Sequence, residues 1–133
     1  MVPGSLIIRR FEDLEIWQLA RDLYKYVFEI TSKEPFNSDF RFRDQMRASA
    51  GSISDNIAEG FERGGNKEFV QFLFISKGSC GETKSQSYRA FDSKYISEEE
   101  LDELLKRAEI ISRKTLNLVR VLKTSDHKGI KYD

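Results

Sequence analysis

The sequence holds few of the residues on which reactive or cross-linked sites depend. Its 133 residues include one cysteine, Cys80, and one histidine, His127. A single cysteine excludes an internal disulfide and is typical of the reducing cytoplasm, where we expect this protein. A single histidine excludes a metal site built from several histidines. A histidine-based catalytic triad would have to use the polar C-terminal segment in which His127 lies.

The chain also has few prolines, no net charge and no long apolar run. With two prolines, 33% charged and 39% hydrophobic residues, the composition favours a folded helical protein over a disordered one. The 22 Lys and Arg equal the 22 Asp and Glu, so no overall attraction to nucleic acid is expected, although a local basic patch is possible. No apolar run approaches the ~20 residues of a membrane span. Residues 1–10 lack the order of a secretory signal, and we expect a flexible arm.

Apolar residues recur at helical spacing in four segments. These run from about Asp13 to Thr31, Phe40 to Phe61, Lys67 to Phe91 and Ser97 to Lys123. Short turns connect them, and no segment alternates with the period of a strand. We therefore predict one all-α domain over residues 11–123, an antiparallel up-down-up-down four-helix bundle, followed by a polar tail over residues 124–133.

Capping residues mark the expected helix ends. Ser97 followed by Glu100 forms a capping box, the clearest start signal in the chain. Asn66 is the expected N-cap of the third helix, and Gly60 is a plausible C-terminal cap of the second. Between these two ends, Gly64 and Gly65 are expected to form the break that separates the second helix from the third.

The third segment has a main stripe whose first half is aromatic and whose second half is mostly small. It consists of Phe69, Phe72, Leu73, Ser76, Cys80, Thr83, Ser87, Ala90 and Phe91. Packing explains Cys80 better than a nucleophilic role, since no histidine is near, although Lys77 and Lys84 lie one turn away. Gly78 and Gly81 each weaken the helix by roughly 1 kcal/mol relative to alanine, so we expect another backbone to approach them closely.

More apolar side chains are present than one bundle needs. A second set on the third helix lies roughly 100–140° from the main stripe, and the fourth helix carries two apolar residues on its back. We expect these residues to form an interface between copies of the chain: Val70, Phe74, Tyr88, Ile110 and Val121. The alternative is a scatter of exposed hydrophobic residues, which is common in folded proteins.

The fourth segment concentrates positive charge. Between Leu104 and Lys123 a single acid, Glu109, stands among six basic residues: Lys106, Arg107, Arg113, Lys114, Arg120 and Lys123. Lys106, Arg113 and Arg120 repeat every seven residues, so they lie along one side of a helix. Such a ribbon can contact phosphates of RNA or DNA, or it can be an ordinary solvated face. A smaller basic cluster begins the second helix: Arg41, Arg43 and Arg47.

Paired carboxylates offer a weak case for catalysis. Asp55, Glu59 and Glu62 lie at spacings that put neighbouring pairs on one helix face, and a hydrolase would need two such carboxyls facing a cleft. Solvation near a helix end, with an ion pair between Glu59 and Arg63, explains them more simply. No phosphate loop or dinucleotide-binding motif is present. We expect no enzymatic activity, no cofactor and no metal.

Several short motifs occur in an order that resembles a known family. They are Phe11 to Leu14 with Trp17 and Gln18, Gln45 to Ala48, Ser52 and Ile53, Asn56 to Gly60, Glu68 and Phe69 with Phe72 and Leu73, and Gly78 and Ser79 with Glu82. The chain resembles the four-helix-bundle proteins encoded in intervening sequences of bacterial large-subunit ribosomal RNA genes, to which the accessory protein of diversity-generating retroelements is related. Ser76 and Cys80 depart from the alanine and leucine that are usual there.

This resemblance implies a homo-oligomer, commonly a pentameric barrel of bundles, with a ring-like shape. It also implies a non-enzymatic role in binding structured RNA or DNA, in some relatives alongside a reverse transcriptase. A protein-interaction module is the alternative function. In that case exposed apolar residues would dock a partner protein: Phe74, Tyr88, Ile110 and Val121.

Overall fold

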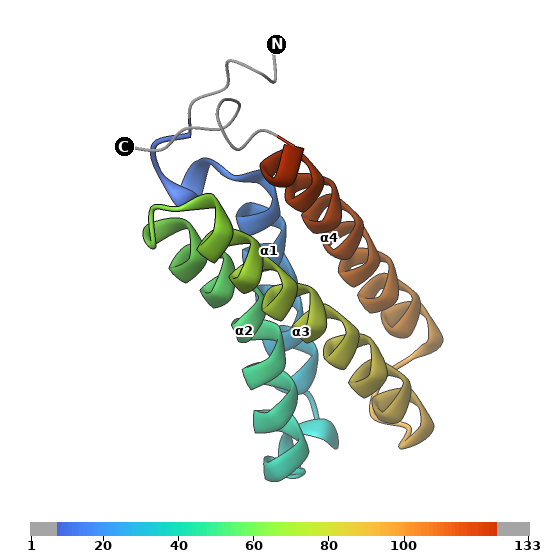
Figure 1. Cartoon of the computed structure of the whole chain (residues 1–133). Coiled ribbons are helices and arrows are strands. Elements are labelled where there is room, and N and C mark those ends of the chain that lie inside the picture. Colours follow the sequence, from blue (N-terminus) through green and yellow to red (C-terminus); the bar gives the residue numbers. More distant parts are fainter. Residues whose placement is uncertain (1–7, 125–133) are drawn as a thin grey trace.

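Four long helices form the fold, as the sequence predicts. The computed structural model describes residues 8–124. In chain order the elements are a 3-10 turn η2 (Phe11–Asp13), α1 (Glu15–Thr31), a 3-10 turn η3 (Phe36–Ser38), α2 (Phe40–Glu62), α3 (Asn66–Asp92) and α4 (Glu98–Thr124). Within this range there is no strand. Successive helices run in opposite directions, so the start of α1 and the end of α4 lie at the same end of the bundle (Figure 1).

The helices surround one core. α1 packs on α2 and α4, and α3 packs on the same two helices. The largest fully buried apolar side chains come from all four helices and from η3: Phe36, Phe69, Leu23, Ile30, Met46, Ile53, Ile57, Leu73, Leu104, Ile111 and Leu122. Ile8, before the first turn, is also buried in this core, whereas Phe91 is 38% exposed at the end of the predicted stripe of α3.

Short polar side chains occupy the contact between α2 and α3. The Ser49 hydroxyl donates to the Gln86 side-chain carbonyl and lies 3.1 Å from the Thr83 hydroxyl, and Ser76 donates to the Ile53 carbonyl at 2.8 Å. These hydroxyls are buried and need such partners, because an unpaired buried polar group is costly. The small side chains therefore let the two helices approach closely and also link them.

The helix ends confirm one predicted cap and correct two others. At the start of α4, the Glu100 backbone N–H donates to the Ser97 hydroxyl at 3.1 Å, and the Ser97 N–H donates to the Glu100 carboxylate at 2.8 Å, which is the predicted capping box. The N-cap predicted at Asn66 is wrong, because Asn66 is already helical and the extended residue before it is Gly65.

The C-terminal cap predicted at Gly60 is also wrong. α2 continues to Glu62, and Gly64 supplies the left-handed turn with a φ of 85°. Gly60 is buried inside the helix instead, where an added Cβ would lie 2.5 Å from the Cβ of Phe72 on α3. Its lack of a side chain thus serves close packing between α2 and α3 rather than helix termination.

Two remaining expectations concern the ends of the chain and membranes. Most of the expected arm and tail, with His127, lies outside the described residues. Thr124, the first residue of the expected tail, is the last residue of α4. No helix between residues 8 and 124 is long and apolar enough to span a bilayer.

Candidate nucleic-acid interface

The seven-residue ribbon on α4 lies at the surface. Lys106, Arg113 and Arg120 are all exposed. Among the described residues, Lys106 and Arg120 form no ion pair, and Arg113 has a long contact in which its Nε lies 3.9 Å from a Glu109 oxygen. These three cations are therefore available to an anionic ligand.

The other side of α4 uses its basic residues to hold α1. The Arg107 Nε lies 2.6 Å from a Glu103 oxygen, and the guanidinium stacks 4.9 Å over the Tyr26 ring of α1. This hydrogen bond from Arg107 lowers the pKa of Glu103 from its ordinary value. Lys114 pairs with Glu15 of α1 at 3.2 Å. Five of the six basic residues thus divide into an available ribbon of three and a pair engaged within the bundle, and the sixth is Lys123.

α3 adds basic residues to the surface beside the ribbon. The Lys84 ammonium donates to Glu109 of α4 at 2.8 Å. That hydrogen bond and the charge of Lys84, with smaller effects of the Arg113 and Lys77 charges, outweigh the opposing effect of burial and lower the pKa of Glu109. At the far end of α4, the Lys123 ammonium lies 5.6 Å from the centre of the Phe74 ring. The grouping of Lys77 and Lys84 around Glu109 joins two helices, so spacing in the sequence gave no sign of it.

The surplus apolar residues differ in exposure. Phe74, Tyr88 and Val121 are 44%, 53% and 37% exposed. Val70 and Ile110 are partly covered, and Val70 packs against the core. Sequence reasoning missed Ile75, which is 52% exposed on the same helix as Phe74.

Gly78 and Gly81 lie in open space on α3. A Cβ added at either position would meet nothing within 4 Å among the described residues. The close approach of another backbone that the sequence predicts therefore does not occur within the described part of the chain. The cost of two helical glycines, roughly 1 kcal/mol each, has no compensation on this face of the single chain.

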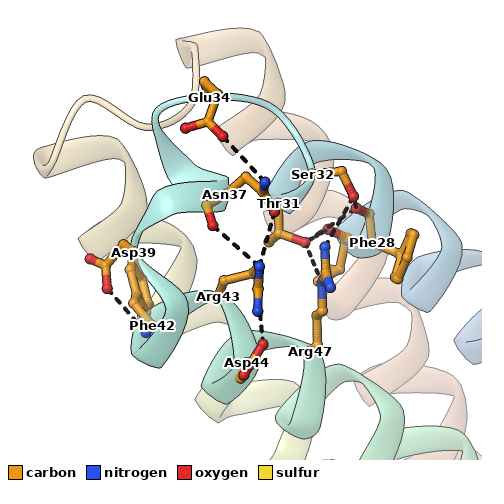
Figure 2. A network of polar contacts seen from close by, with 11 residues as sticks. Phe28, Thr31, Ser32, Glu34, Asn37, Asp39, Phe42, Arg43, Asp44 and Arg47 are labelled. Atoms are coloured by element: carbon orange, nitrogen blue, oxygen red, sulfur yellow. Dashed lines mark hydrogen bonds and ion pairs between the residues drawn. The ribbon is translucent and has the colours of Figure 1, made fainter.

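Arg47, in the smaller basic cluster, is engaged in fixing the start of α2 against the end of α1. Its Nε donates to the Thr31 hydroxyl at 2.8 Å and an Nη donates to the Ser32 hydroxyl at 3.0 Å (Figure 2). The guanidinium also lies 4.2 Å from the centre of the Phe28 ring. A cation at the C-terminal end of α1 is favourable for the helix dipole, so Arg47 has a structural role.

Arg43 is held in the same network. It donates to the Asn37 carbonyl and side-chain oxygens at 3.2 and 3.1 Å, and to Asp44 at 2.9 Å (Figure 2). Its guanidinium stacks 5.0 Å over the Phe40 ring. Arg41 is exposed, so of the three arginines it is the one left accessible to a ligand.

The candidate catalytic residues do not converge on an enclosed site. Glu59 pairs with Arg63 at 2.9 Å, as its spacing suggested. Asp55 lines an open groove of about 620 Å³ between α1 and α2, together with Tyr24 and Arg47. Burial raises the pKa of the Cys80 thiol to about 12, despite the opposing charges of two lysines, so the thiol stays protonated. No group of residues suited to hold a metal ion is found within residues 8–124.

Comparison with known proteins places this fold in a family. The family model of the 23S rRNA-intervening sequence protein matches residues 12–117. The chain belongs to this family. A protein of unknown function from the S23 ribosomal protein family of Bacteroides thetaiotaomicron, known from a crystal structure, has a similar fold. It is 17% identical, with a TM-score of 0.72 over 79% of this chain and 98% of that chain. No curated protein matches the sequence significantly.

In this member of the 23S rRNA-intervening sequence protein family, the motif residues have two kinds of position. Some lie at the contact between α2 and α3: the Ser79 hydroxyl of α3 donates to Ser52 of α2 at 3.0 Å, the Asn56 amide donates to the same Ser52 at 2.8 Å within α2, and Gly60 is buried. The others are exposed, and they are Gln45, Glu59, Gly78 and Glu82. Packing therefore explains the first group, whereas the second group lies where a ligand or another chain can reach it.

Proposed function

We propose that this protein is a non-enzymatic, homo-oligomeric helical scaffold that binds structured RNA or DNA through α4. The observation that carries the proposal is the exposed ribbon of Lys106, Arg113 and Arg120, of which two members lack an ion pair in the described chain. Arginine and lysine side chains at the surface contact phosphates irrespective of base sequence. Arg107 and Lys114 contribute less, because carboxylates already engage them.

Assembly into a ring, as in a pentamer, strengthens this role. The exposed Phe74 and Tyr88, with Gly78 and Gly81 between them, form a stripe on α3 onto which a helix of another copy can pack closely. Each copy then presents one ribbon, and several ribbons contact one nucleic acid. Multiple weak contacts to the same molecule raise the overall affinity without any new kind of contact. This arrangement reconciles the zero net charge of the chain with nucleic-acid binding.

Titration of a structured RNA against salt concentration tests the binding. Each phosphate contact contributes a slope of about −0.9 in log affinity against log salt. Reversing the charges at Lys106, Arg113 and Arg120 should abolish binding, whereas Lys25→Glu on α1, an exposed lysine outside the ribbon, should leave most of it. An affinity that does not depend on salt concentration, or that is unchanged in the triple charge-reversal variant, refutes the proposal.

Light scattering coupled to size exclusion tests the assembly. The wild-type chain should elute as a defined oligomer, and Phe74→Glu with Tyr88→Glu should yield monomers that remain helical. Phe40→Glu is a matched control, because Phe40 is 65% exposed but lies on α2. A wild-type monomer at micromolar concentration would remove the ring from the proposal.

The second candidate is a protein-interaction module, which the exposure of Phe74, Tyr88 and Val121 favours. In this case these residues and Ile110 dock a partner protein, and a reverse transcriptase is the partner class that a relation to the retroelement accessory protein implies. Recovery of one stoichiometric protein with the tagged chain, unchanged by nuclease treatment and lost in Phe74→Glu, would favour it over the scaffold that binds nucleic acid.

A further inference from the structure

Basic residues from α3 and α4 surround a single carboxylate at the edge of the ribbon. The Glu109 oxygens lie 2.8 Å from the Lys84 Nζ and 3.9 Å from the Arg113 Nε. Lys77, about two helix turns before Lys84 on α3, acts on the same carboxylate through its charge alone. The side chains of Lys84, Glu109 and Arg113 are 34%, 49% and 66% exposed. The group is therefore a surface cluster and is open to a ligand.

The cluster has an excess of positive charge. Lys77, Lys84 and Arg113 contribute three cations around the one acid that the chain places between Leu104 and Lys123. Glu109 is ionised at neutral pH, and the hydrogen bond and charge of Lys84, followed by the charges of Arg113 and Lys77, lower its pKa further. One carboxylate cannot neutralise three cations, so the site retains an attraction for a further anion.

We propose that this cluster is a phosphate site, and that Glu109 occupies in the free protein the place that a phosphate of the bound nucleic acid takes. The proposal rests on the function proposed above and adds Lys77 and Lys84 of α3 to the ribbon of α4. A phosphate diester carries one negative charge, as a carboxylate does, and accepts hydrogen bonds from the same lysine and arginine donors. Glu109 holds Lys84 and Arg113 in position before binding and competes with the incoming phosphate.

The structure offers a matched pair of variants. Glu109→Gln and Glu103→Gln remove the same charge from the same helix, and each breaks a pair with a basic residue. Glu109 pairs with Lys84 of α3 and contacts Arg113 of the ribbon. Glu103 pairs with Arg107, which stacks on Tyr26 of α1, and from the ribbon it experiences only the charge of Lys106. Any difference between the two variants therefore reports the position of the carboxylate rather than the net charge.

We expect Glu109→Gln to bind a structured RNA about 1.5- to fivefold more tightly than Glu103→Gln at low salt, because exposed ion pairs of this kind are worth that much. Its slope against salt should also be steeper by about one unit. Lys84→Gln should weaken binding, and adding it to Glu109→Gln should remove the gain. Circular dichroism and thermal melting check that all variants fold.

The outcomes separate this inference from the function on which it rests. Equal affinities of Glu109→Gln and Glu103→Gln, with binding still lost on charge reversal at Lys106, Arg113 and Arg120, would overturn the phosphate site and leave the nucleic-acid interface standing. If the wild-type chain binds no RNA or DNA, the proposed function fails, and titration with tripolyphosphate then decides the site alone. Tighter binding of tripolyphosphate by Glu109→Gln than by Glu103→Gln upholds it, and equal binding overturns it.

Discussion

Replacing Gly60 by alanine tests how closely α2 and α3 pack. A Cβ at this position would lie 2.5 Å from the Phe72 Cβ and 3.1 Å from a ring carbon of Phe69, whereas ordinary contact begins at 3.4 Å. A Cβ is bonded directly to the backbone, so Phe72 cannot relieve the clash by changing its rotamer. The two helices would have to separate, and the edge-to-face contact of Phe69 with Phe61, whose ring centres lie 5.8 Å apart, would loosen.

Two opposing effects set the change in the free energy of unfolding that Gly60→Ala causes. Overpacking a well-filled core costs about 1–3 kcal/mol, whereas alanine gains about 1 kcal/mol over glycine inside a helix. Because the clash involves a Cβ rather than the end of a flexible side chain, we place the cost in the upper part of its range. We therefore expect Gly60→Ala to lower the free energy of unfolding by about 1–2 kcal/mol and the melting temperature by about 3–10 °C.

Urea denaturation followed by circular dichroism measures this change, with Gly51→Ala as the control. Gly51 lies in the same helix, and a Cβ there would meet the Tyr24 ring at 3.6 Å, an ordinary contact. This control should gain up to about 1 kcal/mol from helix propensity. If Gly60→Ala is as stable as Gly51→Ala, the tight contact between α2 and α3 does not exist in solution. Measurements at one fixed protein concentration keep any oligomer from confusing the comparison.

Three further predictions concern the capping box and the thiol. Ser97→Ala should lower the free energy of unfolding in urea by about 0.5–2 kcal/mol, and an unchanged value would mean that the box does not form. The pKa of Glu100 is lowered, because hydrogen bonds from the Ser97 N–H and from Lys33 outweigh the opposing effect of burial. Its contribution to stability is therefore present above its ordinary pKa of 4.5 and lost as the pH falls through the lower folded value. Accordingly, the free energy of unfolding in urea should fall less steeply with decreasing acidic pH in Glu100→Gln than in the wild-type chain. An unchanged dependence on pH would contradict this. Cys80 should react with iodoacetamide at pH 8 far more slowly in the folded chain than in urea, because its thiol has a pKa of about 12. Equal rates would show that the thiol is exposed.

The helices could be predicted from the sequence because their information is local. The apolar period of 3.6 residues locates each helix, and the spacing of Ser97 and Glu100 locates the start of α4 to the residue. The prediction failed at Gly60 because the reason for that glycine lies on another helix. Glycine after an apolar run favours a helix end, but here Phe72 of α3 requires the small residue.

The candidate site also has one part that local spacing predicts and another that depends on how the helices pair. The seven-residue spacing of Lys106, Arg113 and Arg120 shows that they share a side of α4. The engagement of Arg107 by Glu103, four residues earlier, was also readable from spacing but was missed. In contrast, the contact of Lys84 with Glu109 depends on how α3 and α4 pair. No local pattern carries that information, so a single sequence does not reveal it.

The charge distribution along α4 separates the structural explanation of its basic residues from the functional one. The helix begins with Glu98, Glu99 and Glu100 and has Lys123 in its last turn, which is the arrangement that the helix dipole favours. That effect acts within the first and last turns of a helix. It therefore explains Lys123, but it does not reach Lys106 and Arg113 in the interior of α4. For these two interior residues the helix dipole supplies no explanation, so the solvated-face alternative rests on exposure alone, and the proposed phosphate contacts are what the charge reversal at Lys106, Arg113 and Arg120 tests.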